Sequence, residues 1–146
     1  MDASVKWDHG LTFSGTARTG FTVPLGGSKD NGGDEDGFRP LELLLVGLAG
    51  CTAMDVISIL EKKRQDVIGF EVKAHADRAT DHPKVFTDIV VEYIVRGRGI
   101  DPEAVDRAIE LSEIKYCSAY AMLSKTAKIR HITRIVEEAK TVTNPI

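Results

Sequence analysis

The stretch from Leu41 to Leu60 reads LELLLVGLAGCTAMDVISIL and decides the fold class. Pro40 stands directly before it, at a position suited to the first residue of a helix, and Glu42 follows where an acid favours the helix dipole. Because the run is apolar nearly all round, we predict a long helix that is buried on most sides. Glu42 and Asp55 would be costly in lipid, which favours a helix buried in protein over a membrane span. The run raises one question, which is why Cys51 lies in its middle.

The segments around this helix have the patterns of strands and loops. Val5 to Leu25 is rich in Thr, Val and Phe with glycines between them, which predicts two or three short antiparallel strands. The polar, glycine-rich run from Gly26 to Gly37 predicts an exposed, flexible loop. Val67 to Ala76 and Val85 to Val95 each alternate between apolar and polar residues, and a turn separates them, so we expect a hairpin.

The last third of the chain predicts two helices and a strand. Asp101 and Pro102 supply an N-cap and a first-turn proline for an amphipathic helix. Lys115 to Thr126 predicts a second short helix, and an alternating strand begins at Lys128. Strands and helices are largely segregated along the chain, which is typical of the α+β class, and we predict a single domain over residues 1–146.

The composition narrows the classes of partner. The chain has 146 residues, of which 42% are hydrophobic and 28% charged, as in an ordinary globular protein. The net charge of -3, with dispersed Lys and Arg, gives no polyanion-binding pattern, so we expect no nucleic acid partner. The N-terminal MDASVKWDHG lacks the features of a signal peptide, so we expect a cytoplasmic protein without a membrane partner. In that reducing compartment a disulfide between Cys51 and Cys117 would be transient.

The two cysteines are the main chemical feature. Cys51 lies on the buried helix, where a cysteine is most often a small, inert hydrophobic residue. Cys117 lies at the expected start of a short helix, where unpaired N–H groups and the helix dipole lower the pKa of a thiol. Two thiols placed in this way suggest a nucleophile and a resolving partner. Asp55 follows Cys51 by four residues and can share its helix face, where its charge would disfavour a thiolate.

The four histidines do not form a recognisable metal motif. They are scattered at His9, His75, His82 and His131, whereas zinc ligands usually come in close pairs such as CxxC or HxxxH. Spacing also gives no Cys–His catalytic unit, although pairing in space stays open. We therefore expect no metal and no cofactor.

Two segments carry a family resemblance. PLELLLVGLAGCTAMDV, from Pro40 to Val56, and KYCS, from Lys115 to Ser118, together resemble the OsmC/Ohr family, named after osmotically inducible protein C and the organic hydroperoxide resistance protein. The resemblance covers nearly the whole chain, and the phrases DVISIL and KKRQDV are similar to the YhfA-type branch of that family. It implies an OsmC-like fold with antiparallel sheets around a long buried central helix. It also implies an intertwined homodimer with its active site at the subunit interface.

The activity implied by the resemblance is thiol-dependent reduction of organic hydroperoxides. Cys51 would be the peroxidatic thiol and Cys117 the resolving thiol, and their separation of 117 − 51 = 66 residues is similar to that in the family. The substrate would be a small hydrophobic hydroperoxide, and an external dithiol would reduce the disulfide. An apolar surrounding for Cys51 suits such a substrate.

The family's peroxidases also use an arginine and a glutamate, which polarise the peroxide and hold the thiolate. Their glutamate directly follows the proline that starts the helix, whereas this chain has Leu41 there and Glu42 one residue later. At about 100° per residue, Glu42 lies roughly half a turn from Cys51 on an ideal helix, and it can equally be a first-turn acid. Arg18, in ARTG, resembles the family's strand arginine, and Arg39 is its competitor.

Two other classes of function remain open at this stage. The apolar surroundings of Cys51 could hold a small hydrophobic or electrophilic ligand in a binding protein without enzymatic activity. A redox sensor, whose disulfide alters contact with a partner, would use the same cysteines. Ligand binding without turnover would favour the first of these alternatives.

Overall fold

The structure, a computed structural model, describes residues 1–139. Contacts gather in two compact units, one of residues Met1–Leu44 and one that begins at Leu45. We call them the N-terminal unit and the C-terminal unit and describe each by itself. The helix α1 (Pro40–Lys62) begins in the first and continues into the second.

The N-terminal unit is built on a three-stranded antiparallel sheet. Its strands are β1 (Ala3–His9), β2 (Thr12–Ala17) and β3 (Thr22–Leu25), paired in chain order, which confirms the predicted strands. The following loop contains one short 3₁₀ turn, η1 (Lys29–Asn31). A Cβ atom on Gly33 would lie only 2.3 Å from the backbone of Gly27, so the close approach of the two backbone segments requires glycine at Gly33.

This sheet has one apolar face and one polar face. The register places Val5 opposite Gly15 and Trp7 opposite Phe13, and neighbouring residues on a strand point to opposite faces. Val5 is nevertheless 60% exposed and Trp7 63% exposed. The residues of the apolar face, by pairing register, are Ala3, Val5, Trp7, Phe13, Gly15, Ala17, Val23 and Leu25.

Helix α1 begins at Pro40, as the sequence predicts, and buries one stripe of side chains. The stripe has one residue per turn and consists of Leu48, Thr52, Val56 and Leu60. Met54 stays 74% exposed, so the prediction of burial on most sides is wrong for the single chain. By length and mean hydropathy α1 could cross a membrane. Its buried stripe and its charged Asp55 are typical instead of a helix that packs in a protein core.

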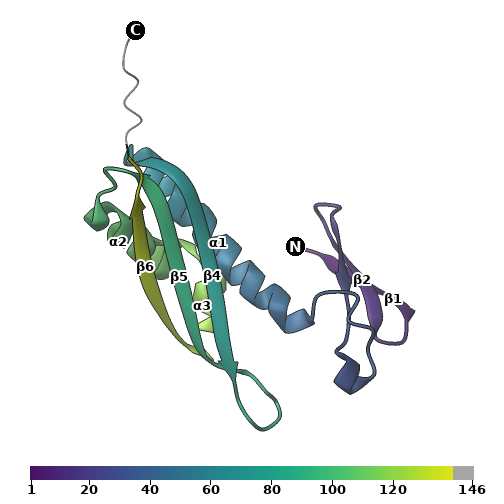
Figure 1. Cartoon of the computed structure of the whole chain (residues 1–146). Coiled ribbons are helices and arrows are strands. Elements are labelled where there is room, and N and C mark those ends of the chain that lie inside the picture. Colours follow the sequence, from purple (N-terminus) through teal and green to yellow (C-terminus); the bar gives the residue numbers. More distant parts are fainter. Residues whose placement is uncertain (140–146) are drawn as a thin grey trace. The chain divides into compact units, whose positions relative to one another are not determined.

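The C-terminal unit packs its helices on one face of a three-stranded sheet (Figure 1). The strands β4 (Asp66–Arg78) and β5 (Phe86–Arg98) are antiparallel neighbours, which confirms the predicted hairpin. Alternate residues of β5 supply the centre of the core, and they are Ile89, Val91, Tyr93 and Val95.

The last strand departs from the prediction of antiparallel sheets. β6 (Lys128–Glu137) runs parallel to β5, so this sheet is mixed. The physical reason is the crossover between them, because the intervening helices return the chain to the same end of the sheet. The overall α+β class is confirmed.

The crossover consists of three helical segments in a row. The helix α2 (Pro102–Leu111) has Asp101 as its N-cap, and the Asp101 side chain accepts a hydrogen bond from the Glu103 N–H, as predicted. A π-helical turn, η2 (Ser112–Tyr116), and the short helix α3 (Ser118–Leu123) follow. The sequence predicts a helix from 115, whereas the structure breaks the helical path at Cys117.

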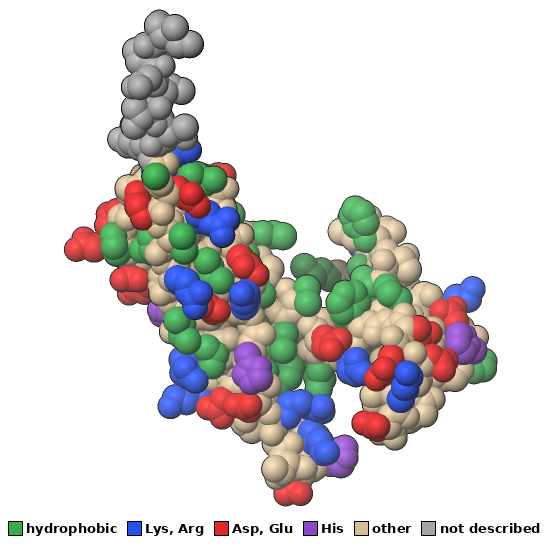
Figure 2. Space-filling model, viewed as in Figure 1, with side chains coloured by type: hydrophobic (Ala, Val, Ile, Leu, Met, Phe, Trp, Pro, Cys, Tyr) green, Lys and Arg blue, Asp and Glu red, His purple; other side chains and the backbone are tan. Residues whose placement is uncertain are grey.

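The surface of the C-terminal unit carries charges of both signs. On the face drawn in Figure 2, acidic and basic side chains lie mixed over the sheet. Ion pairs in this unit include those of Arg134 with Glu92, at 3.0 Å, and of Arg96 with Glu138, at 3.3 Å. Such a mixture gives that face no strongly basic surface.

Candidate functional site: a pair of thiols beside a carboxylate

Cys51 is held by α1, next to the buried stripe. Its neighbour Thr52 is buried, and Cys51 itself is half-buried. Asp55 lies one helical turn further on and is also half-buried, so both side chains project from adjacent positions of the same helix face. The helix therefore fixes the separation of a thiol and a carboxylate.

Cys117 is positioned by the π-helical turn η2. The backbone N–H of Cys117 donates to the carbonyl oxygen of Ser112 at 2.8 Å, a hydrogen bond across five residues that is characteristic of a π-helix. Cys117 then adopts an extended backbone conformation and caps α3, where its sulfur accepts a hydrogen bond from the Tyr120 N–H at 3.3 Å. The Cys117 residue is 2% exposed.

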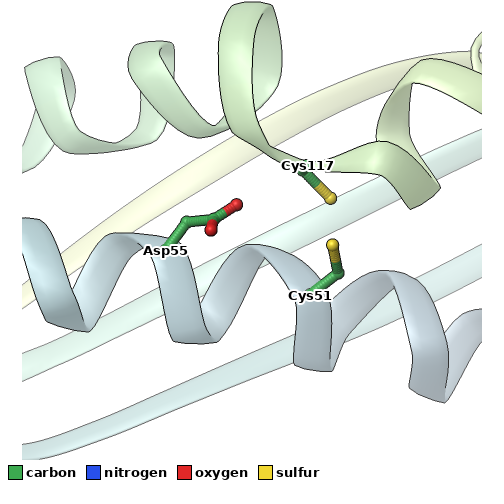
Figure 3. Close-up of side chains that lie close together, drawn as sticks. All are labelled: Cys51, Asp55 and Cys117. Atoms are coloured by element: carbon green, nitrogen blue, oxygen red, sulfur yellow. The ribbon is translucent and has the colours of Figure 1, made fainter.

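The fold brings these three side chains together. The two sulfurs and one Asp55 carboxylate oxygen all lie within 4.8 Å of one another. Figure 3 shows the sulfurs of Cys51 and Cys117 pointing toward each other, with the Asp55 carboxylate beside them. Both cysteines are free thiols in this structure.

Burial reverses the sequence-based expectation for Cys117. Removal from water raises the pKa of the Cys117 thiol to about 12, and the adjacent Cys51 thiol raises it further. The N–H of Tyr120 stabilises the thiolate but does not offset burial. The prediction of a lowered pKa from the start of a helix is therefore wrong, and Cys117 is a thiol at neutral pH.

A chain of buried hydrogen bonds holds Asp55. The Ser112 hydroxyl donates to a carboxylate oxygen of Asp55 at 3.0 Å, and Thr52 bonds Ser112 at 2.9 Å. Thr52 also bonds the Tyr93 hydroxyl at 2.7 Å. Burial raises the pKa of Tyr93 to about 12, so this hydroxyl stays neutral.

Sequence reasoning missed Thr52, Tyr93 and Ser112. The sequence signal for two of them was a polar residue within an apolar pattern, because Thr52 belongs to an apolar helix and Ser112 directly follows the amphipathic helix α2. A buried polar side chain needs a partner, and here each supplies the other's. The pairing itself depends on the tertiary structure.

The two sulfurs and the carboxylate oxygen are of types that can bind a metal ion, and they lie within 4.8 Å of one another. Cys117 would first have to lose the proton that its burial retains, so the cluster in this state is a pair of thiols beside a carboxylate rather than a metal site. Spacing along the sequence could not reveal this cluster, because Cys117 lies 66 positions from Cys51 (117 − 51). A second, exposed set is formed by His9, Asp34 and Asp36 in the N-terminal unit.

A pocket of about 410 Å³ opens beside Asp55. Its walls combine apolar side chains with the polar groups of Asp55, Ser58 and Lys62. The lining residues are Met54, Asp55, Ser58, Ile59, Lys62, Leu111 and Tyr116. The C-terminal unit thus provides a space for a small molecule next to the carboxylate.

The remaining predicted site residues belong to the N-terminal unit. The Glu42 carboxylate accepts a hydrogen bond from the Arg39 N–H at 3.0 Å and lies 3.9 Å from the Arg39 guanidinium. Arg39 also pairs with Glu35 at 3.3 Å. Arg18 is exposed at the end of the first hairpin and lines a pocket of about 570 Å³ in that unit. Their roles toward Cys51 stay predictions.

Comparison with known proteins defines the class. The model of the family described as OsmC-like protein matches residues 32–132, a range that includes both cysteines. The chain therefore belongs to the OsmC-like family.

Individual relatives agree with this placement. The chain is 43% identical over 136 residues to protein YhfA of Escherichia coli (strain K12), which covers 93% of this chain and 98% of the relative.

Solved structures of lower identity show the same fold. An OsmC-like protein from Mycoplasma pneumoniae aligns with a TM-score of 0.79 at 18% identity, over 93% of this chain and 96% of that one. An organic hydroperoxide resistance protein from Elizabethkingia anophelis aligns with a TM-score of 0.67 at 16% identity, over 93% and 94% of the two chains. The fold is thus shared with proteins named for hydroperoxide resistance.

Proposed function

We propose that this chain reduces small organic hydroperoxides through a disulfide between Cys51 and Cys117. The observation that carries the proposal is the approach of the two sulfurs, which lie within 4.8 Å of each other although 66 residues separate them in the sequence (117 − 51). A disulfide requires two thiols whose side chains face each other, and only a modest movement is needed here. Membership of the OsmC-like family supports the same chemistry.

The environments of the two thiols support different roles for them. Cys51 is half-buried and can be reached from solvent, whereas Cys117 is 2% exposed and has a pKa raised to about 12. Because the thiolate is the nucleophile, a buried and protonated Cys117 is unsuited to the first attack. Cys51 is therefore the peroxidatic thiol and Cys117 the resolving thiol.

The reaction has two steps and an external reset. The Cys51 thiolate attacks the terminal oxygen of the hydroperoxide, the O–O bond breaks, and the alkoxide takes up a proton to leave as an alcohol. Cys51 is then a sulfenic acid. The Cys117 sulfur displaces its oxygen, which leaves as water once protonated, and the disulfide forms. An external dithiol reduces the disulfide by exchange, without a metal or another cofactor.

Arg18, Arg39 and Glu42 enter the proposal as the groups that polarise the peroxide and hold the thiolate. Arg39 and Glu42 already pair with each other, which would keep the guanidinium oriented. Arg18→Met and Arg39→Met, measured separately, identify the arginine that acts. Loss of one oriented charge from the reacting group should lower kcat/KM by about 10²-fold, and the other variant should remain near wild type.

We further propose that the protein acts as a cytoplasmic homodimer in which both units form one OsmC-like domain. The apolar face of the N-terminal sheet supports association, since Val5 and Trp7 remain more than half exposed in the single chain. The family match at residues 32–132 spans parts of both units, which supports a single domain.

Turnover tests the proposal. Consumption of cumene hydroperoxide is followed with dithiothreitol as the reductant, for the wild type, Cys51→Ser and Cys117→Ser. We expect Cys51→Ser to abolish enzymatic turnover and Cys117→Ser to lower it, because a sulfenic acid without its resolving partner must wait for the external thiol. Unchanged turnover in Cys51→Ser contradicts the proposal.

The pocket beside Asp55 favours a second candidate, a protein that binds a small hydrophobic or electrophilic ligand without turnover. Its volume of about 410 Å³ lies in the range of small-molecule sites, and its lining combines apolar side chains with Asp55, Ser58 and Lys62. Saturable binding of cumyl alcohol to the wild type, with no consumption of the hydroperoxide, would favour this candidate over the peroxidase.

A further inference from the structure

Asp55 is a charged group at the thiol pair that the mechanism above leaves without a role. Its carboxylate lies within 4.8 Å of both sulfurs, on the helix that carries Cys51 (Figure 3). A carboxylate in this position disfavours a nearby thiolate, and it contributes to the raised pKa of Cys117. If its only effect were repulsion, it would oppose the chemistry of the pair.

The hydrogen bonds around Asp55 keep it in place. One carboxylate oxygen accepts from the Ser112 hydroxyl, and Ser112 is bonded in turn to Thr52. Ser112 also supplies the carbonyl that binds the N–H of Cys117. A single residue of the π-helical turn therefore holds both the carboxylate and the backbone of the resolving cysteine.

The resolving thiol needs a proton acceptor. Cys117 must attack as a thiolate, but its burial keeps it protonated at neutral pH. The titratable side chains that act on Cys117 are Cys51 and Asp55 on α1 and Tyr93 on β5, and the backbone N–H of Tyr120 on α3 binds its sulfur. Tyr93 and Tyr120 both have raised pKa values and are neutral, and the nearby Glu113 carboxylate is paired with His131 at 2.9 Å.

We propose that Asp55 is the general base that accepts the proton of Cys117 when the disulfide forms. Of the groups just named, it is the carboxylate that lies within 4.8 Å of the Cys117 sulfur. Reach over this gap needs a small side-chain rotation or one intervening water, as is usual for catalytic groups in a structure without substrate. This inference rests on the proposed function for its physiological meaning, but its chemistry can be tested without a peroxide.

The step balances as follows. The S–H proton of Cys117 passes to the Asp55 carboxylate, and the freed sulfur attacks the Cys51 sulfenic acid. The S–S bond forms while the S–O bond of Cys51 breaks. The leaving hydroxide takes the proton from Asp55 and departs as water, which returns Asp55 to the carboxylate. Cys51 is reduced from the sulfenic acid level as Cys117 is oxidised, and no further reactant is needed.

A thiosulfonate isolates this step from peroxide chemistry. One equivalent of methyl methanethiosulfonate converts the accessible Cys51 thiol to a mixed disulfide with a methylthio group. Cys117 then attacks the Cys51 sulfur and releases methanethiol, with Asp55 taking the thiol proton and passing it to the leaving sulfur. Intact mass, after acid quenching at successive times, follows formation and loss of the mixed disulfide separately.

The variants are Asp55→Asn, Ser112→Ala and Asp106→Asn. Asp106 is an exposed acid on α2 that serves as a matched control for loss of one charge. We expect Asp55→Asn to slow methanethiol release about 10²-fold at pH 7. Ser112→Ala keeps the Asp55 carboxylate but removes the hydroxyl that holds it, so we expect a smaller decrease in the rate of methanethiol release. Asp106→Asn should release methanethiol at the wild-type rate.

The pH profile separates a base from a structural role. In Asp55→Asn only the preformed Cys117 thiolate can react, so the rate should rise about tenfold per pH unit and approach that of the wild type in alkaline solution. A uniform slowing at every pH would show that Asp55 acts through packing and would overturn the inference. So would release by Asp55→Asn at the wild-type rate, or a wild type whose mixed disulfide does not form or does not resolve.

Failure of the inference and failure of the proposed function give different results. If the wild type resolves the mixed disulfide in an Asp55-dependent way but never turns over cumene hydroperoxide, the base is retained and the peroxidase activity is rejected. If turnover is normal while Asp55→Asn resolves at the wild-type rate, the peroxidase is retained and the role of Asp55 is rejected.

Discussion

The two units of the chain differ in how completely each buries its own apolar side chains. Within residues 1–139, every buried hydrophobic side chain belongs to the C-terminal unit, where α1, α2 and β5 contribute to one core. The N-terminal sheet has an equally consistent apolar face, but its Val5 and Trp7 stay more than half exposed. Alternation along a strand thus defines an apolar face without supplying what covers it. The C-terminal unit completes its own core, and the N-terminal sheet does not.

The largest expected effect comes from a break in the self-contained core. Leu60 is fully buried at the end of the α1 stripe, so Leu60→Ala should lower the free energy of unfolding by about 2–5 kcal/mol. Urea denaturation followed by circular dichroism measures it. Because the contact lies within one chain, the loss should be the same at low and high protein concentration. If the decrease in the free energy of unfolding disappears at high protein concentration, the C-terminal unit does not complete its core within one chain.

The apolar face of the N-terminal sheet should respond differently. If a second copy covers it, Trp7→Glu should shift the protein from dimer toward monomer in sedimentation equilibrium, because a charge would replace a buried aromatic ring. Lys6→Gln changes the net charge equally but lies on the opposite face of β1, and it should remain dimeric. A dimer that tolerates Trp7→Glu as well as Lys6→Gln would show that this face is not the interface.

Alkaline pH should lower the stability of the C-terminal unit. The Cys117 and Tyr93 pKa values rise from 9.0 and 10.0 to about 12 on folding, so above pH 9 the native state binds more protons than the unfolded state. The free energy of unfolding should therefore fall as pH rises from about 9 to about 12. In Cys117→Ser the decline should begin nearer pH 10, where the two tyrosines with raised pKa values, Tyr93 and Tyr120, contribute. Urea titrations at stepped pH measure both curves, and equal curves would rule out the buried thiol as a cause.

The smallest effect is expected from the far end of the hydrogen-bond chain. Tyr93→Phe removes one hydroxyl from Thr52, which keeps its bond to Ser112, so the free energy of unfolding should fall by about 1 kcal/mol. The rate of disulfide formation should stay near wild type, because the Ser112 bond to Asp55 remains. A large change in that rate would mean that the hydrogen bond from Tyr93 to Thr52 also affects the reactivity of the thiols.

Local patterns in the sequence predicted much of the fold. Pro40 and Asp101 marked the starts of two helices, and alternation marked the hairpin of β4 and β5. The parallel pairing of β6 was missed, because strand direction depends on a crossover rather than on any residue of the strand. The exposed side of α1 was missed because an apolar helix face has the same sequence pattern whatever covers it.

The candidate site, too, could be predicted from the sequence only in part. Cys51 and Cys117 could be paired through a family resemblance, and the helical period placed Asp55 beside Cys51. The π-helical turn had no sequence signal, although it sets the position of Cys117. The pKa of Cys117 was predicted in the wrong direction, since the helix start is visible in the sequence while burial is a property of the tertiary structure.

The central claim is that the two facing sulfurs form a catalytic redox pair. The most direct measurement is the non-reducing intact mass of the reduced protein after one equivalent of cumene hydroperoxide, beside Cys51→Ser and Cys117→Ser. The account predicts rapid loss of two hydrogens in the wild type, no oxidation in Cys51→Ser and arrest at the sulfenic acid in Cys117→Ser. An activated thiolate should react within seconds to minutes. If both thiols of the wild type are still reduced after about an hour, the claim is contradicted.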